Sequence, residues 1–128
     1  MTRKLLIVDD EERIRELVQA CLEDLGGWNT LTAASGQEGL KIAQTETHID
    51  AILLDVSMPN MDGFAVYEQL QSHTSTQSIP VILLTAKVLP SDRHRFSQMG
   101  VAGVISKPFE PTSISEEVAE IMGWADEM

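Results

Sequence analysis

Five residues with side chains suited to phosphate chemistry are spread along this sequence. They are three carboxylates, a hydroxyl and an ammonium: Asp9, Asp10, Asp55, Thr85 and Lys107. Clustered carboxylates repel one another, and a hard cation such as Mg²⁺, which takes oxygen ligands, relieves that repulsion. An aspartate can act as a nucleophile toward phosphorus, while ammonium and hydroxyl donors stabilise the charge of the phosphoryl oxygens. If the fold gathers these groups, they support phosphoryl transfer to an aspartate.

The most informative of these positions is Asp55, which ends the apolar run 51–54. Pro59 and Gly63 follow it as turn-forming residues, so the run is expected to be a strand that leads into a loop. Open α/β sheets place their ligand crevice at the carboxyl ends of their strands. Taken alone, this segment also fits a purely structural role for Asp55 at the start of the loop.

Short apolar runs alternate with amphipathic stretches through the whole chain. The runs predict strands at 5–8, 28–33, 51–55, 79–84 and 101–106. Apolar residues at helical spacing predict helices at 14–25, 35–45, 64–72, 91–100 and 114–122. This alternation predicts an α/β fold with three layers, in which a mainly parallel five-stranded sheet is covered by helices on both faces.

Several residues are expected to start or stop these helices. Ser35, with Glu38 three positions later, predicts a capping box for the second helix. Ser91 or Asp92 is expected to cap the fourth helix, which Gly100 closes. The first helix is expected to bury one stripe and to stop at Gly26-Gly27; the stripe is Ile14, Leu17, Val18, Cys21, Leu22 and Leu25.

The carboxyl ends of parallel strands share one edge of a sheet. Four of the five predicted strands end in residues whose side chains could take part in phosphoryl transfer. We therefore expect these residues to meet at this edge; they are Asp9, Asp10, Asp55, Thr85 and Lys107. Each also has a structural interpretation by itself. Asp9 and Asp10 could favour a helix N-terminus, Thr85 could simply end a strand, and Lys107 could be a solvated lysine before a proline.

Length and composition limit the possible functions. The 128 residues are expected to form a single domain, 1–128, with its own core. A formal charge of -11 argues against direct nucleic-acid binding. No apolar run is long enough to span a membrane, and the N-terminus does not read as a signal peptide. Because Cys21 is the only cysteine, an internal disulfide is excluded and a cytoplasmic location is favoured. Cys21 is expected to be a buried, unreactive thiol.

The sequence resembles the receiver domains of bacterial response regulators, including the chemotaxis regulator. The resemblance covers essentially the whole chain and depends on four motifs in order: Ile7-Val8-Asp9-Asp10-Glu11, Leu54-Asp55-Val56-Ser57-Met58-Pro59-Asn60-Met61-Asp62-Gly63, Leu84-Thr85-Ala86 and Lys107-Pro108-Phe109. It implies a doubly wound, flavodoxin-like fold with the strand order 2-1-3-4-5.

The resemblance also implies roles for individual residues. Asp55 would accept a phosphoryl group from a histidine kinase or phosphotransfer protein. Asp10, Asp55 and the backbone carbonyl of Ser57 would ligate Mg²⁺, with Asp9 acting through water. Lys107 would pair with the phosphoryl oxygens, and Thr85 would bind them and move inward. The Lys107-Pro108 peptide would be cis, which proline allows at low cost. The residues two past Asp55 and two past Thr85, Ser57 and Lys87, would influence how long the phosphoryl group survives.

One position departs from the family pattern. Many receivers carry Tyr or Phe three residues before the strand-end lysine, and this chain has Val104. A valine cannot report movement of Thr85 through a change of ring rotamer. We therefore expect switching to proceed through backbone shifts of the loop after Thr85 and of the fourth helix.

Three other functions are less consistent with the residues. A phosphatase of the haloacid-dehalogenase type needs a second aspartate two positions after the nucleophile, where this chain has Ser57. A binding module that has lost phosphorylation would not be expected to keep every acceptor-site residue. The glycine motifs of nucleotide-binding folds are absent. We therefore expect a switch that catalyses only its own phosphorylation and dephosphorylation, and not an enzyme acting on other substrates.

The resemblance implies that such a domain acts through another protein, or as part of a longer chain. Its output face would lie within residues 87–124. Charge there is uneven: 87–95 contains Lys87, Arg93 and Arg95 against Asp92, whereas 110–128 contains six acids and no lysine or arginine. Both stretches are candidates for partner binding, although each could simply be a solvated surface. Trp124 is expected either to pack on the core or to be an exposed interface anchor.

Overall fold

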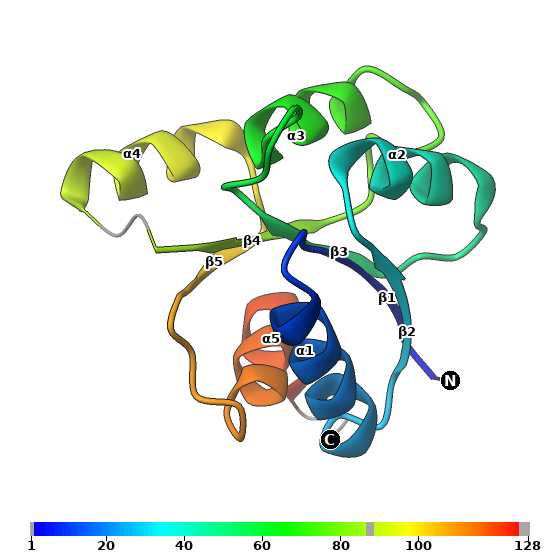
Figure 1. Cartoon of the computed structure of the whole chain (residues 1–128), viewed down its shortest axis with the longest axis vertical. Coiled ribbons are helices and arrows are strands. Elements are labelled where there is room, and N and C mark those ends of the chain that lie inside the picture. Colours follow the sequence, from blue (N-terminus) through cyan, green and yellow to red (C-terminus); the bar gives the residue numbers. More distant parts are fainter. Residues whose placement is uncertain (1, 87–88, 126–128) are drawn as a thin grey trace.

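The computed structural model describes residues 2–86 and 89–125, which form a parallel sheet between two helical layers (Figure 1). The strands are β1 (Lys4–Val8), β2 (Asn29–Ala33), β3 (Ala51–Asp55), β4 (Val81–Thr85) and β5 (Gly103–Ser106). The helices are α1 (Glu12–Asp24), α2 (Gly36–Thr45), α3 (Gly63–Gln71), α4 (Pro90–Met99) and α5 (Ile114–Met122). The strand order is β2-β1-β3-β4-β5, which confirms the predicted doubly wound, flavodoxin-like fold.

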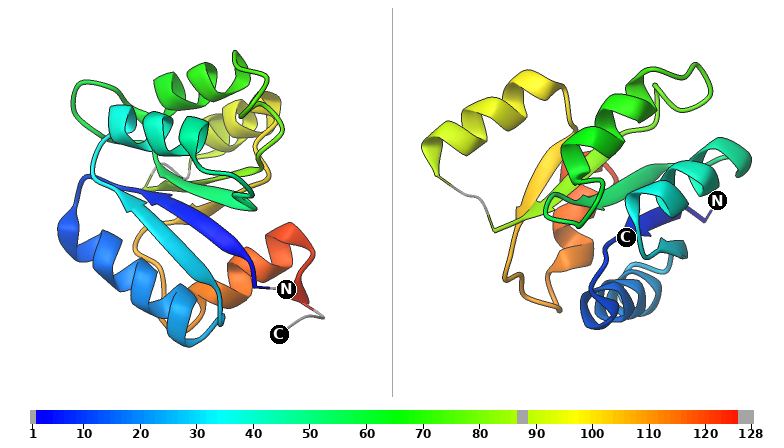
Figure 2. Two further views of the ribbon diagram at one scale, coloured as in Figure 1. Left: turned by 90° about the vertical axis from the view of Figure 1, so that its right-hand side faces the viewer. Right: turned by 45° about the horizontal axis from the view of Figure 1, so that its top comes forward.

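The sheet separates two hydrophobic cores. Successive strand residues point to opposite faces, so Leu5 and Ile7 of β1 pack toward α1 and α5, while Leu6 and Val8 pack on the side of α2, α3 and α4. Figure 2 shows the two helical layers on either side of the sheet. Every residue of β3 and β4 is buried, as expected for central strands covered on both faces.

The predicted helix ends were partly wrong. Ser35 accepts a hydrogen bond from the N–H of Glu38, which confirms the expected cap of α2. The cap of α4 was wrong, because the helix begins at Pro90, and neither Ser91 nor Asp92 precedes its first turn. Proline is well suited to a first helical position, since the N–H that it lacks would have no partner within the helix.

Two of the six stripe residues of α1 are more exposed than predicted. Leu17 is 38% exposed and Leu25 is 52% exposed, whereas Val18 and Leu22 are fully buried. Leu17 lies at the edge of the stripe, and Leu25 follows the last helical residue, where the helical spacing no longer sets the direction of its side chain. Cys21 is half-buried; burial first and then the charge of Asp24 raise the pKa of its thiol, which favours the unreactive, protonated form.

The strand boundaries also differ from the predicted ones by one or two residues. Strand β4 begins after Pro80, because a proline has no N–H to donate to a neighbouring strand. Strand β2 begins after Trp28, whose ring packs edge-on against Trp124 with the ring centroids 5.5 Å apart. Trp124 is therefore a buried core residue. None of the helices in residues 2–86 and 89–125 is long and apolar enough to cross a membrane.

Helix α4 contributes one buried side chain, Phe96, to the core. The ring of Phe96 stacks on that of Phe64 in α3 with the centroids 6.0 Å apart, and the guanidinium of Arg95 lies 3.8 Å from the centroid of the Phe64 ring. At the C-terminal end of the helix, the Tyr67 hydroxyl donates a 2.8 Å hydrogen bond to the carbonyl oxygen of Met99. These contacts attach α4 to α3.

Candidate functional site

The residues predicted to do chemistry come together at one edge of the sheet. Asp9 follows β1, Asp55 ends β3, Thr85 ends β4 and Lys107 follows β5. The Lys107 Nζ lies 3.1 Å from Asp9 Oδ2 and 3.1 Å from Asp55 Oδ1. The parallel register of the strands therefore joins groups that are 98 and 52 positions apart in the sequence.

The three aspartates form a group that could hold a cation. Carboxylate oxygens of Asp9, Asp10 and Asp55 lie within 4.8 Å of one another. Asp9 is completely buried and Asp55 is 2% exposed, while Asp10 is exposed. An all-oxygen set with two buried anions fits Mg²⁺, which is held by few carboxylates and keeps several waters.

Asp9 is held from three sides. Its Oδ1 accepts a 2.9 Å hydrogen bond from the N–H of Glu11, and its Oδ2 faces Lys107. The side chain of Arg15 donates a 2.9 Å hydrogen bond to the backbone carbonyl of Asp9. Arg15 was not predicted as a site residue, because it is six positions from Asp9 and belongs to none of the four motifs.

Burial dominates the electrostatics of Asp55. Desolvation and the nearby charge of Asp9 raise the pKa of the Asp55 carboxyl to about 6, although Lys107 and the N–H of Ser57 act in the opposite direction. Burial disfavours the charged form of Lys107 as well, but the carboxylates of Asp9 and Asp55 outweigh it and raise the pKa of the ammonium. The site therefore has an excess of negative charge that a cation would relieve.

The loop after Asp55 approaches the end of β3 very closely. A Cβ atom on Gly63 would lie 2.6 Å from the carbonyl oxygen of Asp55 and 2.8 Å from the Cα of Val56, so only glycine fits there without a shift of the backbone. The N–H of Gly63 donates to the carbonyl oxygen of Val56 at 2.9 Å. Asp62 caps α3 by accepting from the N–H of Ala65. Asp62 and Gly63 belong to the motif that follows Asp55 in the sequence, but the cap formed by Asp62 and the close backbone approach at Gly63 were not predicted.

Thr85, Ser57 and the Lys107-Pro108 peptide are the remaining predicted parts of the site. Thr85 is buried at the end of β4, and its carbonyl oxygen accepts a 2.8 Å hydrogen bond from the N–H of Lys107. The N–H of Ser57 lies 3.4 Å from Asp55 Oδ1, whereas its carbonyl as a metal ligand stays a prediction. The Lys107-Pro108 peptide is cis, as the resemblance implied. Lys87 lies outside the described residues.

The two charged stretches are partly described. Arg93 and Arg95 are exposed on α4, and Glu116, Glu117 and Glu120 are exposed on α5. Lys87 of the basic stretch, and Asp126 and Glu127 of the six acids in 110–128, lie outside the described residues. The basic and acidic surfaces thus belong to two helices on opposite faces of the sheet, beside its β5 edge.

Comparison with known proteins identifies the family. The model of the response regulator receiver domain matches residues 5–119. The alkaline phosphatase synthesis transcriptional regulatory protein PhoP of Bacillus subtilis is 38% identical over 95% of this chain and 49% of its own length. The response regulator Rre1 of Synechocystis is 37% identical over 92% of this chain and 51% of its own length. The chain spans about half the length of these two relatives.

Solved structures show the same relationship. The chemotaxis response regulator CheY4 of Vibrio cholerae superimposes with a TM-score of 0.86 at 31% identity, over 94% of this chain and 99% of that one. The receiver domain of the sensor histidine kinase PA1611 from Pseudomonas aeruginosa, solved with a magnesium ion in its active-site cleft, gives a TM-score of 0.82 at 26% identity, over 96% of this chain and 99% of that one. The chain described here belongs to the response regulator receiver domain family of two-component signalling.

Proposed function

We propose that residues 1–128 act as one receiver domain in which Asp55 accepts a phosphoryl group from a histidine kinase or phosphotransfer protein. The observation that supports this most directly is the position of Asp55, which is buried at the end of the central strand β3 and shares the ammonium of Lys107 with Asp9. A phosphoryl acceptor needs a positioned nucleophile and nearby groups that cancel charge, and both are present.

The transfer forms one bond and breaks one. An Asp55 carboxylate oxygen attacks the phosphorus of the donor phosphohistidine, an Asp55 oxygen–phosphorus bond forms, and the phosphorus–nitrogen bond breaks. The electron pair of that bond leaves with the imidazole. The ammonium of Lys107, which lies 3.1 Å from Asp55, then pairs with a phosphoryl oxygen, and the hydroxyl of Thr85 donates to another.

The acidic group fits Mg²⁺, which would be held by Asp10, Asp55 and the backbone carbonyl of Ser57. When bound, Mg²⁺ supplies positive charge that offsets the phosphoryl oxygens. Both carboxylate oxygens of Asp9 already interact, with Glu11 and Lys107. This supports a role for Asp9 through a metal-bound water and not as a direct ligand.

The output of this chemistry is a change of surface and not a reaction on another substrate. Helix α4 follows Thr85 in the chain and is attached to α3 through few contacts. We expect phosphorylation to shift the backbone after Thr85 and with it α4, because Val104 offers no aromatic ring to move. The downstream protein would then bind on the face formed within residues 87–124.

Intact mass spectrometry after incubation with acetyl phosphate tests the proposal. The expected result is one phosphoryl adduct that forms with Mg²⁺, is abolished by EDTA and is absent from Asp55→Asn. Asp50→Asn is the matched control, since Asp50 precedes the same strand at its opposite end and binds the N–H of Lys4. If the folded protein forms no adduct in the presence of Mg²⁺, the result would instead favour a phosphorylation-independent protein-interaction module.

A further inference from the structure

The side chain of Arg15 connects the first turn of α1 to the end of β1. Its Nη1 atom donates a 2.9 Å hydrogen bond to the backbone carbonyl oxygen of Asp9. Helical side chains lean toward the N-terminus of their helix, so a long side chain in the first turn can reach back to the preceding strand. Arg15 is half-buried, and its guanidinium contacts the acidic site from the side of α1.

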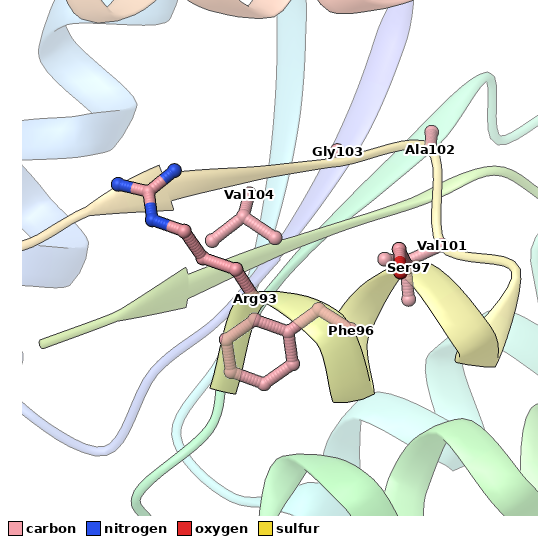
Figure 3. A pocket seen from close by; sticks show the side chains of 7 residues that line it. All are labelled: Arg93, Phe96, Ser97, Val101, Ala102, Gly103 and Val104. Atoms are coloured by element: carbon pink, nitrogen blue, oxygen red, sulfur yellow. The ribbon is translucent and has the colours of Figure 1, made fainter. Parts of the chain in front are cut away.

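Three other arginines contact different parts of the molecule. The guanidinium of Arg3 lies 4.6 Å from the centroid of the Trp124 ring, and that of Arg95 lies over the ring of Phe64. Arg93 extends from α4 toward β5 and lines a hollow of about 290 Å³ between them, as Figure 3 shows. Arg15 is instead placed against the strand end that carries two of the predicted site residues.

Arg15 binds a backbone carbonyl although several acids lie beside it in the sequence. These consecutive acids are Asp9, Asp10, Glu11 and Glu12. Arg15 nevertheless forms no ion pair with a carboxylate of residues 2–86 and 89–125. A guanidinium stays charged and donates in a fixed plane, and a charged donor gives a stronger hydrogen bond than a neutral one. The contact therefore holds the backbone in place and does not neutralise a carboxylate.

The carbonyl that Arg15 binds belongs to the peptide between Asp9 and Asp10. Because a peptide is planar, the orientation of its carbonyl also sets the position of the Asp10 Cα. After Asp10, the N–H of Glu11 donates to Asp9 Oδ1 at 2.9 Å. Asp10 thus lies between two hydrogen-bonded positions, while its own exposed carboxylate accepts no hydrogen bond within the described part of the chain.

The position of the Asp10 carboxylate therefore depends on its backbone. Its oxygen lies within 4.8 Å of carboxylate oxygens of Asp9 and Asp55, and these like charges repel one another. In the metal-free protein this repulsion favours movement of the exposed Asp10 away from the site. The hydrogen bond from Arg15 opposes such movement, because it restricts rotation of the peptide that precedes Asp10.

We propose that Arg15 is a positioning residue for the metal site, which keeps the Asp10 carboxylate directed at Asp55 by holding the Asp9–Asp10 peptide. This inference rests on the proposed function and adds a residue to the same site. Replacing a group that orients a metal ligand typically weakens metal binding by roughly 10- to 100-fold. Charge alone predicts the opposite, since a guanidinium beside the acidic group repels a cation and its removal should strengthen metal binding.

Calorimetric titration with Mg²⁺ decides between these two effects. Arg15→Met removes the donor and keeps a long side chain, whereas Arg13→Met removes the same charge from an exposed position of the same helix. In about 0.5 M KCl, which screens exposed charges strongly, Arg15→Met should raise the Kd for Mg²⁺ by roughly tenfold or more. Arg13→Met should leave the Kd unchanged. An unchanged or lower Kd in Arg15→Met would overturn the proposal.

A double-mutant cycle tests whether Asp10 carries the effect. In Asp10→Asn the metal no longer gains from the position of this carboxylate, so the further change Arg15→Met should alter the Kd by less than about twofold. Shifts of amide signals during Mg²⁺ titration follow binding in these weaker variants. If Arg15→Met weakens binding as much in Asp10→Asn as in the original chain, Arg15 acts through another group and the proposal is wrong.

The motion of the backbone gives a measurement without metal. ¹⁵N relaxation in EDTA reports on the amides of Asp10 and Glu11. In Arg15→Met their order parameters should fall from about 0.85 toward 0.6, while those of β3 and those of Arg13→Met stay as in the original chain. Order parameters that are the same in Arg15→Met and in the original chain would show that the peptide is held without Arg15, and would disprove the inference.

The proposed function and this inference fail in different ways. In Arg15→Met the Mg²⁺ concentration for half-maximal formation of the Asp55 adduct should rise by the same factor as the Kd. An adduct with the same Mg²⁺ dependence in the variant and the original chain would disprove the role of Arg15 alone. Absence of the adduct from the original chain would overturn the proposed function, and the Kd and the order parameters would still test Arg15.

Discussion

The Nζ atom of Lys107 lies 3.1 Å from Oδ1 of Asp55, so an ammonium that follows the edge strand β5 faces the carboxylate that ends the central strand β3. The same ammonium faces Asp9 at 3.1 Å. One cation therefore holds two buried anions, and the stability of the site depends on it.

Removing that cation should destabilise the protein. Lys107→Met leaves two buried carboxylates without their shared partner, and the free energy of unfolding at pH 8 in EDTA should fall by about 3 kcal/mol, as for other broken buried pairs. Mg²⁺ should then raise the melting temperature more in the variant than in the original chain, because the cation meets an unneutralised site. Thermal unfolding with and without Mg²⁺ measures both effects. Lys41→Met, on the exposed surface of α2, should change neither.

The raised pKa of Asp55 predicts a pH-dependent stability. The folded protein binds this proton more tightly than the unfolded chain, since the pKa rises from 3.8 to about 6. The resulting stabilisation is fully present below pH 3.8 and is lost as the pH rises through about 6. Asp55→Asn removes the titration, so its stability relative to the original chain should increase by about 2 kcal/mol between pH 4 and pH 8 without metal.

Urea unfolding of both proteins in EDTA across this pH range measures the difference directly. Comparing the two proteins cancels groups that titrate alike in both. A relative stability that stays constant, or that decreases toward pH 8, would contradict the raised pKa of Asp55.

Gly63 should matter for metal binding as well as for stability. In Gly63→Ala the new methyl group meets the backbone of Asp55 and Val56 at 2.6 to 2.8 Å, so the loop must move at a cost of about 2 kcal/mol. The Mg²⁺ affinity should fall too, because Ser57 lies in the displaced segment. Gly27→Ala is the control: Gly27 has a φ of +72° but open space around it, so that variant should lose stability and keep its Mg²⁺ affinity. Calorimetric titration with Mg²⁺ distinguishes the two.

The attachment of α4 to α3 can be weakened selectively. Tyr67→Phe removes the hydroxyl that donates to the carbonyl oxygen of Met99, and the local stability should fall by about 1 kcal/mol. Hydrogen exchange is expected to accelerate at the amides of α4 while those of β3 are unchanged. Equal acceleration in both elements would mean that α4 does not open separately from the core.

Much of the fold could be predicted from local patterns. Apolar runs that end at Asp55 and Thr85 indicated strands, and the alternation with amphipathic helices left a parallel sheet as the consistent arrangement. The cap at Ser35 and the stop at Gly100 were confirmed because their signals depend on adjacent residues alone. The exposure of Leu17 was not predicted, since it depends on how far neighbouring elements cover α1. The start of α4 at Pro90 was not predicted either, since it depends on competition between possible first turns.

By itself the sequence determined which groups stand at the strand ends, because strand length and residue order are local properties. Only the tertiary structure decided their distances and environment. The packing of β5 beside β4 places Lys107 against Asp9 and Asp55, and burial between two helical layers raises the pKa of Asp55. Distances of this kind depend on contacts between residues far apart in the chain, which no local pattern encodes.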